Sequence, residues 1–77
     1  MEAQWIETPE SSHVVAVKYD PDTSELSVRL NNGRVGEEEY KYYAVPEDVW
    51  NEFLVSASKG RYLNIVLGRQ YRYEKVG

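Results

Sequence analysis

The sequence predicts an α+β fold: a small antiparallel β-sheet with one helix packed on a face, in the order β-β-β-α-β. Short segments of alternating or β-branched residues, separated by turn residues, fill the first half of the chain. A single stripe of apolar residues at helical spacing follows them. Because no linker, repeat or low-complexity tract divides the 77 residues, we expect one domain over residues 1–77, with residues 1–10 as a flexible N-terminus.

The first two predicted strands form a hairpin. Residues His13–Asp20 are rich in β-branched side chains, and alternation places Val15, Val17 and Tyr19 on one face. Residues 21–23 have turn chemistry, because proline fixes φ and aspartate side chains bond to the local backbone. Residues 25–31 then alternate cleanly, with the leucines and the valine on the inner face. We therefore expect these two strands to pair antiparallel.

A third strand is expected to cover at least Tyr40–Tyr43. Asn32-Gly33 precedes it and is a strong hairpin signal, because both residues tolerate positive φ. Gly36 is interpreted either as a bulge or as part of a longer loop, and the run Glu37-Glu38-Glu39 as solvated. Within the strand, Tyr40 and Tyr42 must share one face, with Lys41 and Tyr43 on the other.

A helix is predicted from Pro46 to Lys59. Proline suits the first helical turn, where its missing N–H costs nothing, and Glu47 and Asp48 in that turn favour the helix dipole. Lys59 then lies in the last turn, and Gly60 is placed to end the helix in a left-handed conformation. The apolar stripe between these ends consists of Val49, Trp50, Phe53, Leu54 and Ala57.

The pattern of the C-terminal residues 61–76 fits more than one kind of secondary structure. Residues 62–67 fit either a short helical turn or an extended covering segment, and Gly68 is expected to end it. Residues Gln70–Val76 predict a final strand, in which Tyr71 and Tyr73 share one face and Arg72 lies on the other.

Charge is distributed unevenly along the chain. Residues 1–54 hold four basic and twelve acidic side chains, a net charge of −8, whereas residues 55–77 hold five basic side chains and one acidic, a net charge of +4. A basic patch attracts phosphate even on an acidic protein, because salt confines each field to about 8–10 Å. The overall charge of −4 nevertheless weighs against tight nonspecific binding of nucleic acid.

Composition gives little support to catalysis or metal binding. The chain has no cysteine and a single histidine, His13, and adjacent strand residues such as Ser12 and His13 point apart. The glutamate run 37–39 lacks the alternating ligands and glycine of a calcium loop. We therefore expect no catalytic residue, no metal and no cofactor. Since no apolar run approaches the roughly 18 residues that span a bilayer, and no secretory signal is visible, we expect a cytoplasmic protein without membrane contacts.

Several short motifs occur in a specific order along almost the whole chain. They are Ser11-Ser12, Tyr19-Asp20, Asn32-Gly33, Tyr40-x-Tyr42 followed by Val45-Pro46, Ser58-Lys59-Gly60, and Tyr71-x-Tyr73. In this order the chain resembles the KTSC domain, a module named for the C-terminal region of some lysyl-tRNA synthetases. The resemblance covers about residues 11–76.

The resemblance implies a family of uncharacterised function, found as small stand-alone bacterial and phage proteins, with RNA binding proposed by association. One departure is the spacer Arg34–Glu39 between the Asn-Gly turn and the Tyr-x-Tyr motif, which is longer than usual. Because the excess is even, a simple strand extension keeps the tyrosines on the same face. It also lengthens an acidic hairpin, which is a poor place for phosphate.

Two function hypotheses follow from the tyrosines and the basic C-terminal third. The first is a non-enzymatic module that binds RNA or single-stranded nucleic acid, with rings stacked on bases and cations at phosphates. Its expected site residues are Lys41, Tyr43, Lys59, Arg61, Tyr62, Arg69 and Arg72. The second is a protein-interaction or regulatory module, acting as a monomer or homodimer, whose exposed aromatics and acidic hairpin meet a partner protein.

Both hypotheses compete with simpler interpretations of the same residues. One tyrosine pair from each strand can instead pack beneath the helix, as aromatics often do in small sheets. Lys59, Arg61 and Tyr62 form either a compact basic-aromatic corner that binds a ligand or an ordinary surface turn.

Overall fold

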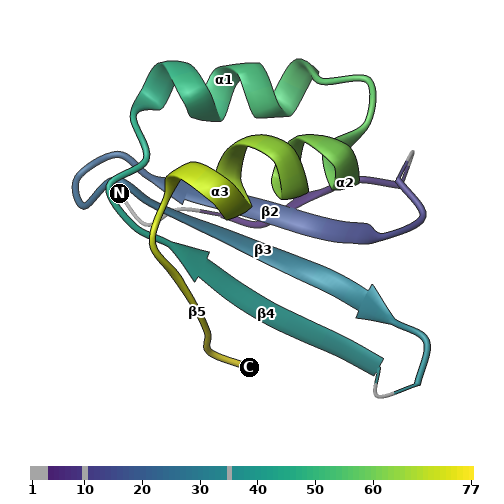
Figure 1. The fold of residues 1–77 in the computed structure, drawn as a ribbon. Helices are drawn as coiled ribbons and strands as arrows, with labels where there is room; N and C mark the ends of the chain where they lie inside the picture. Colours follow the sequence, from purple (N-terminus) through teal and green to yellow (C-terminus); the bar gives the residue numbers. More distant parts are fainter. Residues whose placement is uncertain (1–3, 10, 35) are drawn as a thin grey trace.

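The fold is a five-stranded antiparallel sheet with helices on one face (Figure 1). The computed structural model describes residues 4–9, 11–34 and 36–77. Its strands are β1 (Ile6–Glu7), β2 (Val14–Asp20), β3 (Glu25–Asn32), β4 (Gly36–Tyr42) and β5 (Tyr73–Lys75), each beside the next in that order. The α+β class is confirmed, and the sheet gains a short strand, β1, within the N-terminal residues that were expected to be flexible. Residues 1–3 and 10 of that segment lie outside the described residues.

The β2–β3 hairpin forms as predicted, with one change of face. Tyr19 pairs with Leu26 and Val17 with Val28, and the Asp22 N–H donates to the Asp20 carboxylate at 2.9 Å in the turn. A bulge shifts the register between Val14 and Ala16. Because a one-residue shift reverses side-chain direction, Val14 joins Val17 and Tyr19 in the core, whereas Val15, predicted to share their face, is only half-buried.

The β4 strand begins at Gly36, four residues earlier than the minimum predicted from the tyrosines. The run Glu37-Glu38-Glu39, interpreted as solvated, is part of this strand and pairs with residues 29–31 of β3; Glu37 is exposed and the other two are half-buried. Gly36 has a φ of 87°, which a residue with a side chain rarely adopts, and it allows the chain to enter β4 from the turn. Tyr43 lies just beyond the end of the strand.

Helix α1 (Glu47–Val55) starts one residue after the predicted Pro46, which is its N-cap, and ends four residues early. The Ser56 N–H and hydroxyl both donate to the Phe53 carbonyl, at 3.2 and 2.7 Å, and Ser56 itself is extended. Serine competes with helical hydrogen bonding in this way, so the chain leaves the helix there. The prediction of a helix through Lys59 is wrong.

A second helix replaces the predicted stop at Gly60. It consists of α2 (Lys59–Tyr62), the π-helical turn η1 (Leu63–Leu67) and α3 (Gly68–Gln70), and we call it the C-terminal helix. These pieces are continuous, because the residues at both junctions are right-handed helical. Ser58 caps its start, accepting from the Arg61 N–H at 3.4 Å. Neither Gly60 nor Gly68 ends a helix, contrary to the prediction. The predicted final strand Gln70–Val76 is shortened to β5, and its first residue, Gln70, is helical.

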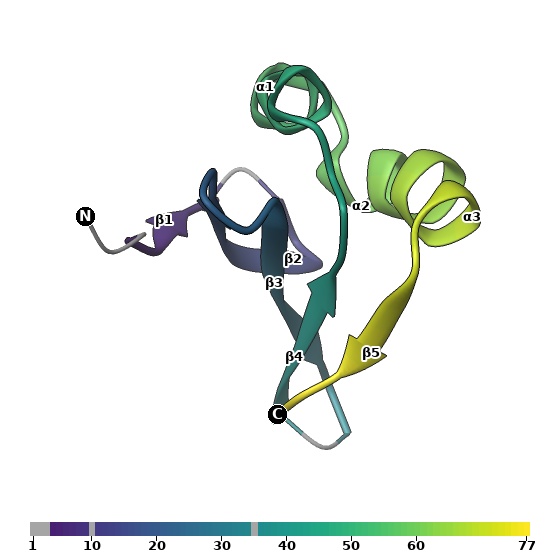
Figure 2. The same ribbon diagram turned by 90° about the vertical axis from the view of Figure 1, so that its left-hand side faces the viewer.

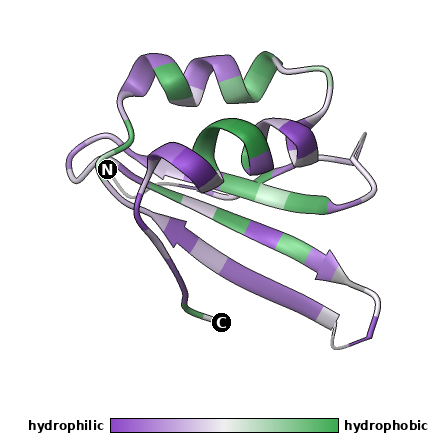
Figure 3. Ribbon diagram, viewed as in Figure 1, coloured by the Kyte–Doolittle hydropathy of each residue, from purple (hydrophilic) through white to green (hydrophobic). Residues whose placement is uncertain are grey.

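The core lies between the sheet and the two helices, which run side by side above it (Figure 2). Hydrophobic residues are concentrated in β2 and η1 and alternate with hydrophilic ones along β3, whereas β4 and α3 are largely hydrophilic (Figure 3). Phe53 is completely buried at the helix–helix contact, with ring centroids of Trp50 and Tyr62 at 6.3 and 5.6 Å. Among the described residues, no helix has the length and apolar character needed to cross a membrane.

Candidate nucleic-acid interface

Lys41 lies on the sheet face opposite the helices, where cations already have partners. Its Nζ is 3.5 Å from the Glu25 carboxylate. On the same face Arg29 lies 3.7 Å from the carboxylates of both Glu37 and Glu39, and its guanidinium lies over the Trp5 ring at 4.4 Å. Since each of these charges is neutralised by a neighbour, this face is a poor surface for phosphate.

Tyr43 and Arg72 come together at the edge formed by β5. With Tyr73 and Glu74 they line a shallow hollow of about 450 Å³. The Tyr43 hydroxyl donates to the Glu74 carboxylate, and this hydrogen bond raises the pKa of Tyr43, while the positive charge of Arg72 acts in the opposite direction. Two predicted site residues thus meet here, but beside a carboxylate.

Lys59 lies in a recess and not on an exposed corner. Only 6% of its surface is exposed. It lines a pocket of about 180 Å³ with Gly60 and with Ser11-Ser12 from the far end of the chain, so two of the short motifs meet in space. Lys59 also starts a helix where it was expected to end one. The dipole at this position therefore favours anions, the reverse of the predicted effect.

Tyr62 is a packing residue that joins the two helices. Its hydroxyl donates to the Val49 carbonyl at 3.5 Å, its ring is tilted against Phe53, and burial raises the pKa of its hydroxyl. With Lys59 recessed and Tyr62 packed, the basic-aromatic corner is reduced to Arg61 alone. That part of the prediction is wrong, because the chain turns into a new helix at this point.

Arg61 and Arg69 are exposed on the C-terminal helix. With Ile65, which is 49% exposed, they follow one another at four-residue intervals, so they lie along one side of the helix. We call this surface the arginine face. Residues 56–73 contain no aspartate or glutamate, and within the described part of the chain neither arginine has an ion-pair partner.

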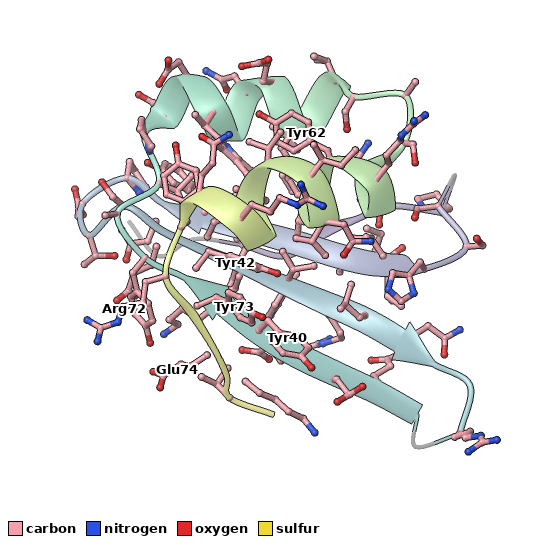
Figure 4. All side chains as sticks on the ribbon, viewed as in Figure 1. Tyr40, Tyr42, Tyr62, Arg72, Tyr73 and Glu74 are labelled. Atoms are coloured by element: carbon pink, nitrogen blue, oxygen red, sulfur yellow. The ribbon has the colours of Figure 1, made fainter. Side chains whose placement is uncertain are left out.

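Three tyrosines outside the predicted site form one cluster between β4 and β5. Tyr42 pairs with Tyr73 across the strands, their ring centroids are 5.2 Å apart, and the Tyr40 ring lies 6.1 Å from that of Tyr73 (Figure 4). Tyr42 is 4% exposed, as the packing interpretation requires, but Tyr73 is 49% exposed. The strand alternation predicted that Tyr40 and Tyr42 share a face, whereas the approach of Tyr73 depends on a register that one sequence does not reveal.

The Tyr42 hydroxyl gives the domain a measurable alkaline transition. Burial raises the pKa of Tyr42 to about 12, and Tyr73 and Tyr40 act in the same direction. An unfolded tyrosine titrates near pH ~10. The unfolded chain therefore releases this proton first, and the stability present below pH ~10 is lost as the pH rises toward ~12. Urea unfolding at several alkaline pH values measures the loss, and Tyr42→Phe is expected to reduce it. An equal loss in the variant would contradict this assignment.

No metal centre is visible in the described ranges: they contain no group of three or more histidine, aspartate or glutamate side chains that could hold an ion. Ser11, two residues before the single histidine, uses its Oγ to accept from the backbone N–H groups of His13 and Val14, at 3.3 and 3.0 Å. The serine–histidine segment is therefore a hydrogen-bonded turn at the entry to β2.

Two proteins of known sequence are similar to this chain over more than four fifths of its length. A protein of Tsukamurella paurometabola is 35% identical over 63 residues, which cover 82% of this chain and 88% of that protein. The lysine–tRNA ligase of Nostoc sp. is 32% identical over 68 residues, which cover 88% of this chain but 11% of the ligase. The chain thus matches about a tenth of the ligase's length.

The fold has a solved counterpart. The crystal structure of a KTSC domain protein from Yersinia pestis superposes with a TM-score of 0.84 at 29% identity, covering 99% of this chain and 100% of that one. A family model described as the KTSC domain matches residues 10–73. The chain belongs to the KTSC domain family.

Proposed function

We propose that this domain binds single-stranded RNA along the arginine face, with Arg61 and Arg69 contacting phosphates and Arg72 extending the contact toward β5. The observation that carries the proposal is the absence of any carboxylate between residues 56 and 73, where four cations occur. Arginine binds phosphate through paired, planar hydrogen bonds, and exposed arginines without carboxylate partners are free to do so.

The contrast between the two sides of the domain supports this location. On the outer sheet face Lys41 and Arg29 are engaged by glutamates, so a phosphate there has to compete with existing ion pairs. On the arginine face a phosphate replaces only water. The sequence similarity to lysine–tRNA ligases, proteins that act on an RNA, agrees with an RNA ligand.

Salt dependence tests the proposal. Each phosphate contact on a single strand contributes about −0.7 to the slope of log affinity against log salt, so three arginines give a slope near −2. Raising the salt concentration from about 50 to about 200 mM is then expected to weaken binding roughly 15- to 20-fold. Fluorescence anisotropy of a labelled single-stranded RNA measures this directly. Absence of binding at low salt and high protein concentration would exclude the proposal, and a protein ligand bound with little salt dependence would favour an interaction module.

A further inference from the structure

The tyrosine cluster borders a pocket of about 210 Å³ between β4 and the C-terminal helix. Its walls include Tyr40, Tyr42 and Tyr73 from the sheet, and Asn64 and Gly68 from the helix. Gly68 carries no side chain to fill the space, and Asn64 belongs to η1, a π-helical turn of the type often found at functional sites. The volume lies below the ~300–1,000 Å³ typical of drug-sized ligands, so it suits a single planar ring system.

The chemistry of the walls favours a neutral ring over a phosphate. The described residues that line the pocket include His13 but no lysine, arginine, aspartate or glutamate. Tyrosine rings offer π-faces, and Tyr73 is half exposed there. The Asn64 amide both donates and accepts hydrogen bonds, which matches the mixed edge of a nucleobase.

The Tyr42 hydroxyl is available to a ligand in the pocket. The side chain is 96% buried, since only 4% of its surface is exposed, and it lines this pocket. Among the described residues no hydrogen-bond partner is found for its hydroxyl. By contrast, the hydroxyl of buried Tyr19 donates to the Val45 carbonyl at 2.5 Å. Among the described residues no buried side-chain oxygen or nitrogen lacks a hydrogen-bond partner, so the Tyr42 hydroxyl keeps contact with solvent at the pocket. A ligand in the pocket that accepts its hydrogen bond replaces water there.

We infer that this pocket receives one unstacked nucleobase of the single-stranded RNA proposed above. Tyr73 and Tyr40 supply the stacking surface, and Asn64 and the Tyr42 hydroxyl bond to the base edge. Asn64 and Gly68 lie in the helical row next to Arg61, Ile65 and Arg69. A strand whose phosphates follow the arginine face therefore passes beside the opening of the pocket. The inference rests on the proposed function, because it names the base site of the same ligand.

Matched variants separate this role from packing. Tyr42→Phe is expected to weaken binding of a single-stranded RNA about 2- to 10-fold while keeping the fold, because it removes one hydroxyl bond to the ligand and no bond within the described protein. Tyr19→Phe removes a hydroxyl that the fold uses, and is expected to lower stability without changing RNA affinity. Tyr73→Leu is expected to cost about 5- to 150-fold in affinity, the range for loss of one stacked base.

The set is completed by Asn64→Ala, with Asn51→Ala at an exposed position of α1 as its control. Asn64→Ala is expected to lower RNA affinity about as much as Tyr42→Phe does, and Asn51→Ala to leave it unchanged. Three ligands are compared: an intact RNA oligonucleotide, the same oligonucleotide with abasic sugars, and free adenosine or uridine. Binding of the free nucleoside is detected by NMR, as shifts of the Asn64 and Gly68 amide signals. The abasic strand is expected to bind wild type as weakly as Tyr73→Leu binds intact RNA.

The possible failures are distinguishable. If intact RNA binds but the three pocket variants bind it as wild type does, the base pocket is excluded and the proposed function stands. If no strand binds but free nucleoside shifts Asn64 and Gly68, the pocket stands and the proposed strand-binding function falls. If neither ligand binds, both are excluded.

Discussion

Replacing Phe53 with alanine is expected to lower the free energy of unfolding by about 3–5 kcal/mol, the cost of truncating a fully buried aromatic ring. Phe53 has no exposed surface and packs between Trp50 of its own helix and Tyr62 of the C-terminal helix. Small domains have stabilities near the lower end of the range of ~5–15 kcal/mol, so this variant is expected to be close to unfolding. Urea unfolding followed by circular dichroism measures the change.

Val55 provides the control for Phe53. It lies two residues further along the same helix and is 83% exposed. Val55→Ala is expected to change stability by no more than about 0.5 kcal/mol. A loss below about 1 kcal/mol for Phe53→Ala would mean that the two helices do not pack through this ring.

Reversing the charges of Arg61 and Arg69 is expected to weaken binding to single-stranded RNA at least about 100-fold. Each hydrogen bond to a charged group contributes about 1.5–3 kcal/mol, so losing two contacts corresponds to roughly 3–6 kcal/mol before any repulsion is counted. Both side chains are exposed, so stability is expected to change by no more than about 0.5 kcal/mol. Anisotropy titrations of Arg61→Glu/Arg69→Glu and wild type at the same low salt give the comparison.

A double variant on the opposite face carries the same change in net charge. Lys18→Glu/Lys41→Glu alters side chains that contact the Trp5 ring and Glu25, respectively, on the outer face of the sheet. Its affinity for RNA is expected to stay within about threefold of wild type, because salt screens charges beyond about 8 Å. If this variant loses as much affinity as Arg61→Glu/Arg69→Glu, net charge and not the arginine face controls binding.

The parts of the fold that the sequence predicts are those fixed by local chemistry. The β2–β3 hairpin and the start of α1 follow from turn residues and from Pro46 with its acidic first turn. The end of α1 was missed because Gly60 resembles a helix stop, whereas the decisive signals are the hydroxyls of Ser56 and Ser58. Ser56 ends one helix and Ser58 caps the next. Because a single helix through Lys59 was predicted, the expected direction of the helix dipole at Lys59 was the reverse of the observed one.

The candidate site depends on contacts between residues far apart in the chain, which one sequence does not specify. Charge counting indicated the basic C-terminal third, and Arg61 and Arg69 are exposed there. It did not reveal that Lys41 is paired with Glu25, because that pairing requires the β3–β4 register. Nor did it identify Asn64, because residues 62–67 fit both a helical turn and an extended segment, and the two conformations place its side chain differently.

The sheet ends on both sides in very short strands, β1 with two residues and β5 with three. A long unpaired strand edge is a template on which other chains can add strands and aggregate. Here β1 covers the middle of β2 and β5 covers the last three residues of β4, and the uncovered parts of these two strands carry charged residues such as Asp20 and Glu37. Such a domain can be joined to a larger chain without creating a surface on which copies polymerise through their sheets.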